Sequence, residues 1–362
     1  MKLFVDNEFK GHHSEYLDII IKYHQVNSKR LVLAVSQEYY NNRKDIHHVD
    51  NIVFVVLKKT LNLLDKFKEV KQIQEIAKEF SVNEICLLNF NYYFKLMFFF
   101  GKKYSISGIY FMPYLMKSNI SKKEYRLKTI QFKSIFLFCN IKSIMILNDT
   151  DAVSKFNNLF KNNKFSYLVD PVYYLEEPSL STSNREKLVL SFLGEVSPRK
   201  GIFQFLDALD NLEKEKLNKL EICIAGNSTV FKEEILVRIG VLEKKCPTLF
   251  GNVYLDRVEE SVFNTILLKA DIVLCLHQKV EGSSGIVGKA SVFKKPIIGP
   301  KEGLIGCLIK KYGIGVQINT KDPLNISKAI ENILEKRIQI EDHKFEHYVE
   351  DHSPDQFVKK LI

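Results

Sequence analysis

The chain has 362 residues, of which 46% are hydrophobic and 27% are charged. This length suits two domains of ordinary size, and the balance of apolar and charged residues excludes a disordered chain. The formal net charge is +10, and the whole excess lies in the first half, where residues 1–175 hold 26 Lys and Arg against 16 Asp and Glu.

In the first half of the chain, short apolar runs alternate with longer segments of helical period. Residues 60–80 carry apolar residues three and four positions apart, which predicts an amphipathic helix. The apolar runs predict strands at 2–6, 30–35, 51–57, 84–90, 105–111, 143–148 and 165–172. Strands that alternate with helices are typical of α/β architecture with parallel sheets.

The segment KGHHSEY, at residues 10–16, comes shortly after the first predicted strand. Gly11 leaves room at this turn for a ligand to approach the backbone. His12 and His13 are adjacent, so they do not share one helix face as metal-binding histidines four residues apart would. We expect one of them to hydrogen-bond a hydroxyl or a phosphate, and the alternative is a pair of ordinary surface histidines.

Residues 90–146 hold ten Lys and Arg against a single acid, Glu124, together with fifteen Phe and Tyr. A basic surface with aromatic side chains suits an anionic membrane, a phosphate-bearing substrate or nucleic acid. Nucleic acid is the least favoured partner, because the sequence has no motif of a nucleic-acid-binding module. The alternative for this region is a core helix whose lysines face water.

Residues 176–186 are rich in Ser, Thr and Pro and lack an apolar period, which predicts an interdomain linker. A second series of strands is predicted at 187–194, 219–226, 251–256, 270–277 and 295–299. A helix is predicted at 327–337. We therefore expect an N-terminal domain at 1–175, a C-terminal domain at 187–340 and a helical segment at 341–362.

In the stretch FLGEVSPRKGI, a predicted strand ends at Gly194 and a helix begins at Gly201. Arg199 and Lys200 therefore stand at a helix N-terminus, where free N–H groups and the helix dipole already favour anions. Arginine can bind two phosphate oxygens with its planar fork, and lysine adds a point charge. The pair predicts a diphosphate site, and the alternative is a solvated basic turn.

The stretch EGSSGIVGKA joins the strand at 270–277 to the start of another helix. Ser283 or Ser284 is suited to cap that helix, and Gly285 lets phosphate oxygens come close to the backbone. Glu281 has a carboxylate that can accept hydrogen bonds from sugar hydroxyls. The alternative is an ordinary strand–loop–helix turn with a solvated acid.

Several kinds of site and location are disfavoured by what the sequence lacks. None of the six cysteines belongs to a CxxC pair, so buried reduced thiols in a cytosolic protein are expected. The first residues carry no apolar signal region, and no apolar run is long enough to span a bilayer. Without GxxxxGK[ST], HExxH, GxSxG or GxGxxG motifs, P-loop, zinc-protease and hydride-transfer chemistry have no support.

The second half of the chain resembles the donor domain of the retaining glycosyltransferases of family 4. The resemblance lies in the order and spacing of three stretches, GEVSPRKGIFQFLDAL, LEICIAG and ADIVLCLHQKVEGSSGIVGKASVFKKPIIGPKEGL. It covers about residues 187–362, whereas the first domain matches mainly through Gly11 and the rhythm of its strands. It implies the GT-B fold, an α/β architecture in which two Rossmann-like domains face each other across a deep cleft and a C-terminal helix crosses back to the first domain.

The resemblance also implies a role for each matching residue. Arg199 and Lys200 would bind the donor diphosphate and stabilise the leaving nucleotide. Glu281 would hold hydroxyls of the donor sugar, and His13 would face the reaction centre from the other domain. The remaining donor-site positions that the resemblance implies are Gly11, His12, Gly194, Gly226, Asn227, Arg257, Ser283, Ser284, Gly285, Ile286, Val287 and Lys289.

One position departs from the family pattern. The family places a second acid eight residues after the first, where it bonds the nucleotide ribose, and Lys289 stands there in this chain. Lysine cannot accept a hydrogen bond, so the ribose contact must change. It moves to another residue, or Lys289 contacts a phosphate; the alternative is that Lys289 faces solvent.

The implied function is a retaining transferase of bacterial surface polysaccharide synthesis. It would move a sugar from a UDP- or GDP-sugar to a glycan or lipid-linked acceptor, with no metal and no cofactor. We expect a cytoplasmic protein, peripheral at most on the inner face of the plasma membrane, with residues 90–146 on anionic lipid and no nucleic-acid partner. The alternative, suggested by Lys289, is a catalytically silent nucleotide-sugar-binding subunit of a glycosyltransferase complex.

Overall fold

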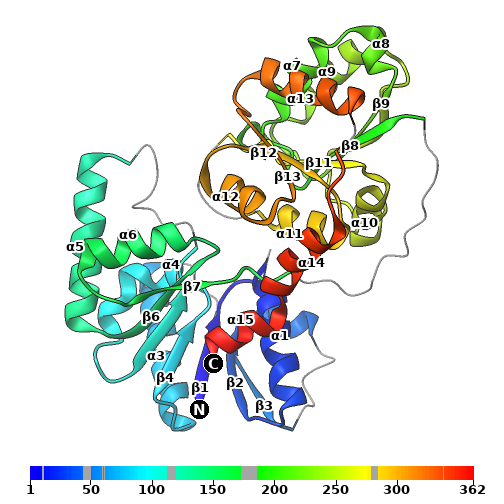
Figure 1. Cartoon of the computed structure of the whole chain (residues 1–362). Coiled ribbons are helices and arrows are strands. Elements are labelled where there is room, and N and C mark those ends of the chain that lie inside the picture. Colours follow the sequence, from blue (N-terminus) through cyan, green and yellow to red (C-terminus); the bar gives the residue numbers. More distant parts are fainter. Residues whose placement is uncertain are drawn as a thin grey trace. The chain divides into compact units, whose positions relative to one another are not determined.

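The computed structural model of the chain divides into two compact units. Unit 1 comprises Met1–Pro171 and Ser353–Ile362, and unit 2 comprises Val172–His352. Each unit contains one parallel sheet with helices packed on it (Figure 1). The residues that the structure describes are 1–9, 12–43, 50–58, 60, 62–111, 120–172, 186–278, 284–336 and 338–362.

The sheet of unit 1 has the strand order β3-β2-β1-β4-β5-β6-β7. β1 pairs in parallel with both β2 and β4, so the strand order changes direction at β1. The carboxyl ends of strands at such a switch point form the usual ligand-binding edge of an open α/β sheet. The strands are β1 (Lys2–Asp6), β2 (Leu31–Val35), β3 (Ile52–Val56), β4 (Glu84–Leu87), β5 (Ser105–Ile109), β6 (Asn140–Leu147) and β7 (Phe165–Leu168).

Helices cover the sheet of unit 1, and side chains cap several of them. Asn62, Ser121 and Asp149 accept hydrogen bonds from backbone N–H groups at the starts of α3, α5 and α6. The helices are α1 (His12–Val26), α2 (Gln37–Asn42), α3 (Leu63–Glu79), α4 (Phe90–Tyr93), the 3-10 helix η2 (Phe94–Phe99), α5 (Lys122–Phe138), α6 (Thr150–Phe160) and α15 (Pro354–Leu361).

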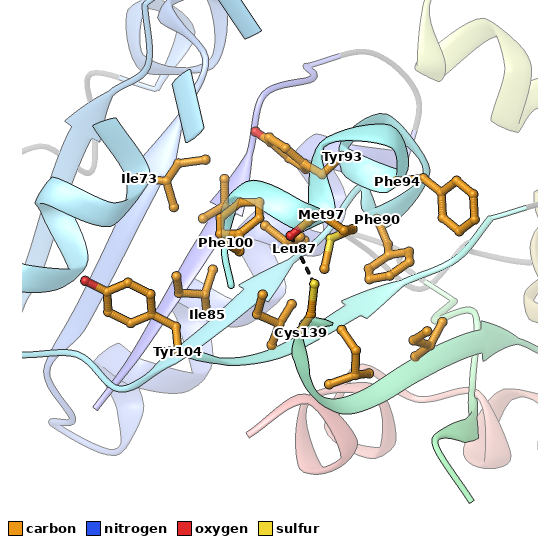
Figure 2. Close-up of a cluster of buried hydrophobic side chains, with 14 of the residues drawn as sticks. Ile73, Ile85, Leu87, Phe90, Tyr93, Phe94, Met97, Phe100, Tyr104 and Cys139 are labelled. Atoms are coloured by element: carbon orange, nitrogen blue, oxygen red, sulfur yellow. Dashed lines mark hydrogen bonds between the residues drawn. The ribbon is translucent and has the colours of Figure 1, made fainter. Parts of the chain in front are cut away.

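Large aromatic and aliphatic side chains of β4, α4 and η2 fill the core of unit 1. Figure 2 shows Tyr93, Phe94 and Met97 packed in this cluster, where the Cys139 thiol donates to the Met97 carbonyl oxygen at 3.1 Å. Each fully buried side chain of this size stabilises the fold by roughly 1.5–3 kcal/mol. This packing fixes η2 on the unit while its last two residues, Phe98 and Phe99, remain exposed.

The sheet of unit 2 has the strand order β10-β9-β8-β11-β12-β13, all parallel. Its switch point lies between β8 and β11. The strands are β8 (Leu188–Leu193), β9 (Leu220–Ala225), β10 (Phe250–Tyr254), β11 (Ile272–Leu274), β12 (Ile297–Pro300) and β13 (Gly315–Ile318).

The helices of unit 2 alternate with its strands, as expected for parallel pairing. Helix α7 packs with α13, and α11 packs with α14. The helices are the 3-10 helix η4 (Pro198–Lys200), α7 (Ile202–Asp210), α8 (Lys214–Leu217), α9 (Lys232–Lys245), α10 (Glu260–Lys269), α11 (Gly285–Val292), α12 (Gly303–Tyr312), α13 (Pro323–Glu335) and α14 (Asp342–Asp351).

Each predicted strand is present in the structure, with ends that differ by a few residues, and β13 is a further strand. The helical segment predicted at 341–362 contains two helices, α14 and α15. These two helices belong to different units. Helix α14 buries Phe345 and Tyr348 in unit 2, whereas α15 packs on α1 in unit 1. The predicted linker 176–186 lies outside the described residues except for Glu186.

Candidate functional site

The site in unit 2 is built where β8 and β9 end, at the carboxyl edge of the sheet. Gly194 follows β8 and Gly226 follows β9, with φ of +100° and +155°. A Cβ on Gly226 would lie 1.5 Å from the Gly194 carbonyl oxygen, so glycine is required for this close approach. The N–H groups of Gly194 and Val196 donate to the carbonyls of Ala225 and Asn227, both at 3.0 Å, and join the two loops.

The 3-10 helix η4 carries the two cations predicted to bind a diphosphate, and it is pressed against the segment after β11. Gly201, which follows η4 with φ +88°, lies so close that a Cβ there would be 2.1 Å from the Leu276 carbonyl oxygen. The Gln278 N–H donates to the Arg199 carbonyl at 2.9 Å. The Arg199 guanidinium pairs with the Glu195 carboxylate, and both side chains are about half exposed.

The ammonium group of Lys200 contacts the segment that leads from β11 into α11. Its Nζ lies 2.6 Å from Nε2 of His277 and 3.3 Å from Oγ of Ser284. His277 is 7% exposed, and Ser284 is the N-cap of α11. The cation is therefore held at the switch point of the sheet, between the end of β11 and the first turn of α11.

The burial of this pair changes the charges that it can carry. Burial lowers the pKa of Lys200 to about 8, and the neighbouring Arg199 cation acts in the same direction. Burial also lowers the pKa of His277 to about 3, with a further effect from Lys200. At neutral pH the imidazole is uncharged, so its Nε2 accepts the hydrogen bond of the ammonium.

The first turn of α11 offers backbone donors beside this cation. The Ser284 side chain makes no capping bond to the helix and accepts from Lys200 instead. The N–H groups of Gly285 and Ile286 belong to the first turn, which has no intrahelical acceptor for them. Together with the helix dipole, they make this end of α11 favourable for an anion.

Lys289 contacts α10. Its Nζ lies 3.2 Å from Oε1 of Glu260 and 5.0 Å from the centre of the Phe263 ring. The Lys289 side chain is 32% exposed. The pair places a carboxylate, that of Glu260, beside the position where the family pattern has its second acid.

In unit 1, a carboxylate holds one of the two predicted histidines. Nδ1 of His13, in the first turn of α1, lies 2.9 and 3.0 Å from the carboxylate oxygens of Asp6, the fully buried last residue of β1. Burial raises the pKa of Asp6, and the contact with His13 opposes that shift. The carboxylate favours a hydrogen on Nδ1, which leaves Nε2 of His13 able to accept a hydrogen bond.

The other site residues predicted from the sequence lie outside these clusters or outside the described residues. His12 contacts Glu15 at 3.3 Å on the surface of α1, and its side chain is 46% exposed. Asn227 and Arg257 are exposed, at the ends of β9 and β10. Gly11, Glu281 and Ser283 lie outside the described residues.

His277 and Asp6 are among the residues of these clusters that were not predicted from the sequence. Both are polar residues at or just after the end of a predicted strand, in ADIVLCLH and KLFVD. That position was the available signal, because the carboxyl ends of strands form the binding edge of such sheets.

Within the described ranges, no three His, Cys, Asp or Glu side chains gather as a metal site would require. Residues Asp149, Thr150 and Asp151 have the letters of a DxD triplet. The Asp149 carboxylate accepts a hydrogen bond from the Ala152 N–H at 2.8 Å and caps α6. Among the helices described, none has both the length and the apolar character for a membrane span.

Comparisons with known proteins show what this chain is similar to. Residues 176–352 match the family model of glycosyl transferases group 1. A relative from Campylobacter jejuni is 26% identical over 204 residues and is named GalNAc-alpha-(1->4)-GalNAc-alpha-(1->3)-diNAcBac-PP-undecaprenol alpha-1,4-N-acetyl-D-galactosaminyltransferase. The match spans 54% of this chain and 51% of the relative, so the chain spans about half the length of this curated relative.

Solved structures share the fold along almost the whole chain. A glycosyltransferase from Rickettsia africae aligns with a TM-score of 0.73 and 15% identity, covering 99% of this chain and 96% of that one. The HepE protein of Anabaena in complex with UDP aligns with a TM-score of 0.72 and 12% identity, covering 99% and 98%. The prediction of two Rossmann-like domains of the GT-B kind is thereby confirmed.

Proposed function

We propose that this chain, whose residues 176–352 match the family model of glycosyl transferases group 1, moves a sugar from a nucleotide-diphosphate sugar to a glycan or lipid-linked acceptor. The donor is a UDP- or GDP-sugar, the anomeric configuration is retained, and the product serves bacterial surface polysaccharide synthesis. The observation that carries the proposal is the buried Lys200 ammonium, 2.6 Å from the uncharged ring of His277 at the start of α11.

The chemistry of sugar transfer requires positive charge at this place. When the bond between the sugar and the diphosphate breaks, negative charge develops on the leaving phosphate. Lys200 and Arg199 stabilise that charge, and the N–H groups of Gly285 and Ile286 add hydrogen bonds. These groups provide the stabilisation that a metal ion would otherwise supply, so the proposed reaction uses no metal and no covalent protein nucleophile.

The identity of the donor draws support from a structural neighbour. The HepE protein, which has the same fold, was solved with UDP. In this chain, Glu281 follows β11 and precedes α11, so its carboxylate is our proposed partner for the hydroxyls of the donor sugar. Glu260, held by Lys289, is the described carboxylate closest to the position of the ribose-binding acid in the family pattern.

The acceptor is proposed to contact unit 1 through His13. Because Asp6 holds Nδ1 of His13, Nε2 is available to accept a hydrogen bond from the attacking hydroxyl. A lipid-linked acceptor is consistent with the Campylobacter jejuni relative, whose name contains PP-undecaprenol.

We propose that a surface of unit 1 attaches the protein to anionic lipid. Figure 1 shows α5 along an outer flank of this unit. Six large apolar side chains on η2 and α5 are between 44% and 63% exposed: Phe98, Phe99, Leu127, Ile130, Leu137 and Phe138. Exposed basic residues lie on or near the same elements: Lys102, Lys103, Lys122, Lys123, Arg126 and Lys133.

Apolar and basic side chains on one helix face are typical of helices that lie in a membrane interface. The rings of Phe98 and Phe138 are 5.7 Å apart, so η2 and the end of α5 form one continuous surface. A location in the cytoplasm, on the inner face of the plasma membrane, follows as part of the proposal.

Vesicle binding tests this attachment. The first variant replaces four lysines of this surface by Glu: Lys102, Lys103, Lys122 and Lys123. It should lose most of its binding to vesicles that contain phosphatidylglycerol. The matched control makes the same change at four exposed lysines of unit 2, Lys214, Lys219, Lys244 and Lys310. Equal binding by both variants would contradict the attachment.

The transferase proposal itself is tested with donors. A thermal-shift screen against UDP, GDP, ADP and their sugars should show stabilisation by one nucleotide series, because a ligand that binds only the folded state raises its stability. Transfer or hydrolysis of that sugar should be lost in Arg199→Ala and Glu281→Ala. Donor binding without turnover in the wild type would instead favour the silent nucleotide-sugar-binding subunit.

A further inference from the structure

We propose that His277 is a positioning residue for the donor diphosphate, acting through Lys200. Its unprotonated Nε2 fixes the ammonium of Lys200 at the first turn of α11, 2.6 Å from the ring and 3.3 Å from Ser284 Oγ. This inference rests on the proposed function, because the diphosphate is the ligand that the fixed cation would bind. His277 itself does not need to touch the donor.

Hydrogen bonds hold the backbone around His277 in place. The Thr320 hydroxyl donates to the His277 carbonyl oxygen at 2.9 Å, which ties this residue to the segment after β13. The next residue, Gln278, donates from its backbone to Arg199 at 2.9 Å, and its side chain donates to the Thr320 carbonyl at 2.9 Å. The backbone of His277, a residue that is 7% exposed, is therefore held close to η4, and Nε2 of its ring contacts Lys200.

An uncharged acceptor suits a phosphate site better than a carboxylate would. A carboxylate at this distance would neutralise Lys200 and compete with the phosphate for it. Imidazole orients the ammonium with a hydrogen bond and leaves its positive charge available. The low pKa of His277, which results from burial and from Lys200, keeps the ring in this neutral form.

The other titratable groups around Lys200 do not replace this role. Arg199 repels the ammonium, and Glu195, which attracts it, is already paired with Arg199. The Cys275 thiol is buried and its pKa is raised to about 12, so it stays uncharged. Among the described residues, His277 and Ser284 are thus the hydrogen-bond partners of the Lys200 ammonium, and neither carries charge.

Two substitutions of similar size separate the acceptor from the bulk of the ring. In His277→Gln, an amide oxygen can take the place of Nε2 as acceptor. In His277→Leu, the site still excludes water but the acceptor is lost. The charged form of Lys200 is then less stable, so the pKa of Lys200 should fall further. A circular-dichroism melt of each variant establishes that it is folded before binding is measured.

The first measurement is UDP binding by calorimetry between pH 6.5 and 9.5. In the wild type, affinity should fall as pH rises through about 8, because the Lys200 ammonium loses its proton there. His277→Leu should bind UDP about tenfold more weakly at pH 7, and its fall should begin at a lower pH. His277→Gln should remain within about threefold of the wild type, with the same pH dependence.

The second measurement does not depend on the donor. The rate at which acetic anhydride modifies the Lys200 amine, followed by mass spectrometry across the same pH range, reports the fraction of neutral lysine. The titration should move to lower pH in His277→Leu and stay in place in His277→Gln. Identical titrations in all three proteins would overturn the inference, whereas a wild type that binds no nucleotide would overturn the proposed function alone.

Discussion

His277 in unit 2 and His13 in unit 1 are both held by one neighbour, but those neighbours have opposite charges. Nε2 of His277 accepts from the Lys200 ammonium, whereas Nδ1 of His13 contacts the Asp6 carboxylate. His277 follows β11, whereas His13, in the first turn of α1, contacts the last residue of β1. The same side chain can therefore direct a cation in one unit and present a free basic nitrogen in the other.

The two pairs also respond to pH in opposite ways. The lowered pKa of His277 gives stability that is present above about pH 6.5 and is lost as pH falls toward 3. The raised pKa of Asp6 gives stability below its ordinary value of 3.8 that is lost as pH rises through the folded-state value. In both cases burial disfavours the charged form, so the difference follows from the sign of the charge.

The largest expected effect separates binding from stability at Lys200. Lys200→Met should weaken UDP binding roughly a hundredfold, because charge-assisted hydrogen bonds are lost. It should also raise the thermal midpoint at pH 7. Burial lowers the folded-state pKa of Lys200 from its ordinary value of 10.5 to about 8, so the ammonium costs stability below pH 10.5, and the full cost is present below about pH 8.

Calorimetry of UDP binding and of unfolding measures both effects. Lys219→Met, at an exposed lysine of the same unit, is the matched control and should change neither quantity. Unchanged UDP affinity in Lys200→Met would remove Lys200 from the site.

The second prediction concerns the other histidine. Asp6→Asn should lower the transfer rate by about tenfold to a hundredfold, because the amide no longer favours the proton on Nδ1 of His13. UDP affinity should stay the same, since the residues proposed to bind the diphosphate lie in unit 2. Single-turnover assays with saturating donor measure the rate, and a parallel loss of UDP binding would show that the two histidines do not have separate tasks.

The third prediction concerns the stability of the fold at acidic pH. Between pH 7 and pH 4.5 the wild type should lose about 2 kcal/mol of unfolding free energy through His277, because the unfolded chain binds a proton that the folded ring resists. His277→Leu should lack this contribution. Urea unfolding of both proteins at the two pH values measures it, and equal losses in both would mean that His277 is protonated in the folded state.

The smallest effect is expected at Lys289, whose ion pair with Glu260 is partly exposed to solvent. Lys289→Glu sets two carboxylates side by side and should cost less than about 1 kcal/mol of stability. Exchanging both charges, with Glu260→Lys added, should restore it. UDP affinity should change by less than about threefold, and a larger change in the single variant would place Lys289 within the donor site.

Much of the fold could be predicted from the sequence, because its signals are local. Alternating apolar runs and helical periods located the strands, and the order of Gly194, Arg199, Lys200 and Gly285 indicated a phosphate-binding sheet edge. The unit on which each helix of residues 341–362 packs could not be predicted in this way. Both α14 and α15 are amphipathic, and only packing decides that one buries its apolar face in unit 2 and the other in unit 1.

Local patterns in the sequence predicted the α/β class, the two sheets and the residue types of the proposed diphosphate site. The tertiary structure alone decided the partners of those residues. Lys200 and His277 are separated by 77 positions, and Lys289 and Glu260 by 29. No local pattern links residues so far apart. Lys200 and His277 meet because parallel strands bring their carboxyl ends to one edge of the sheet, whereas Lys289 and Glu260 lie in α11 and α10. Burial at that edge then sets which of them carries charge.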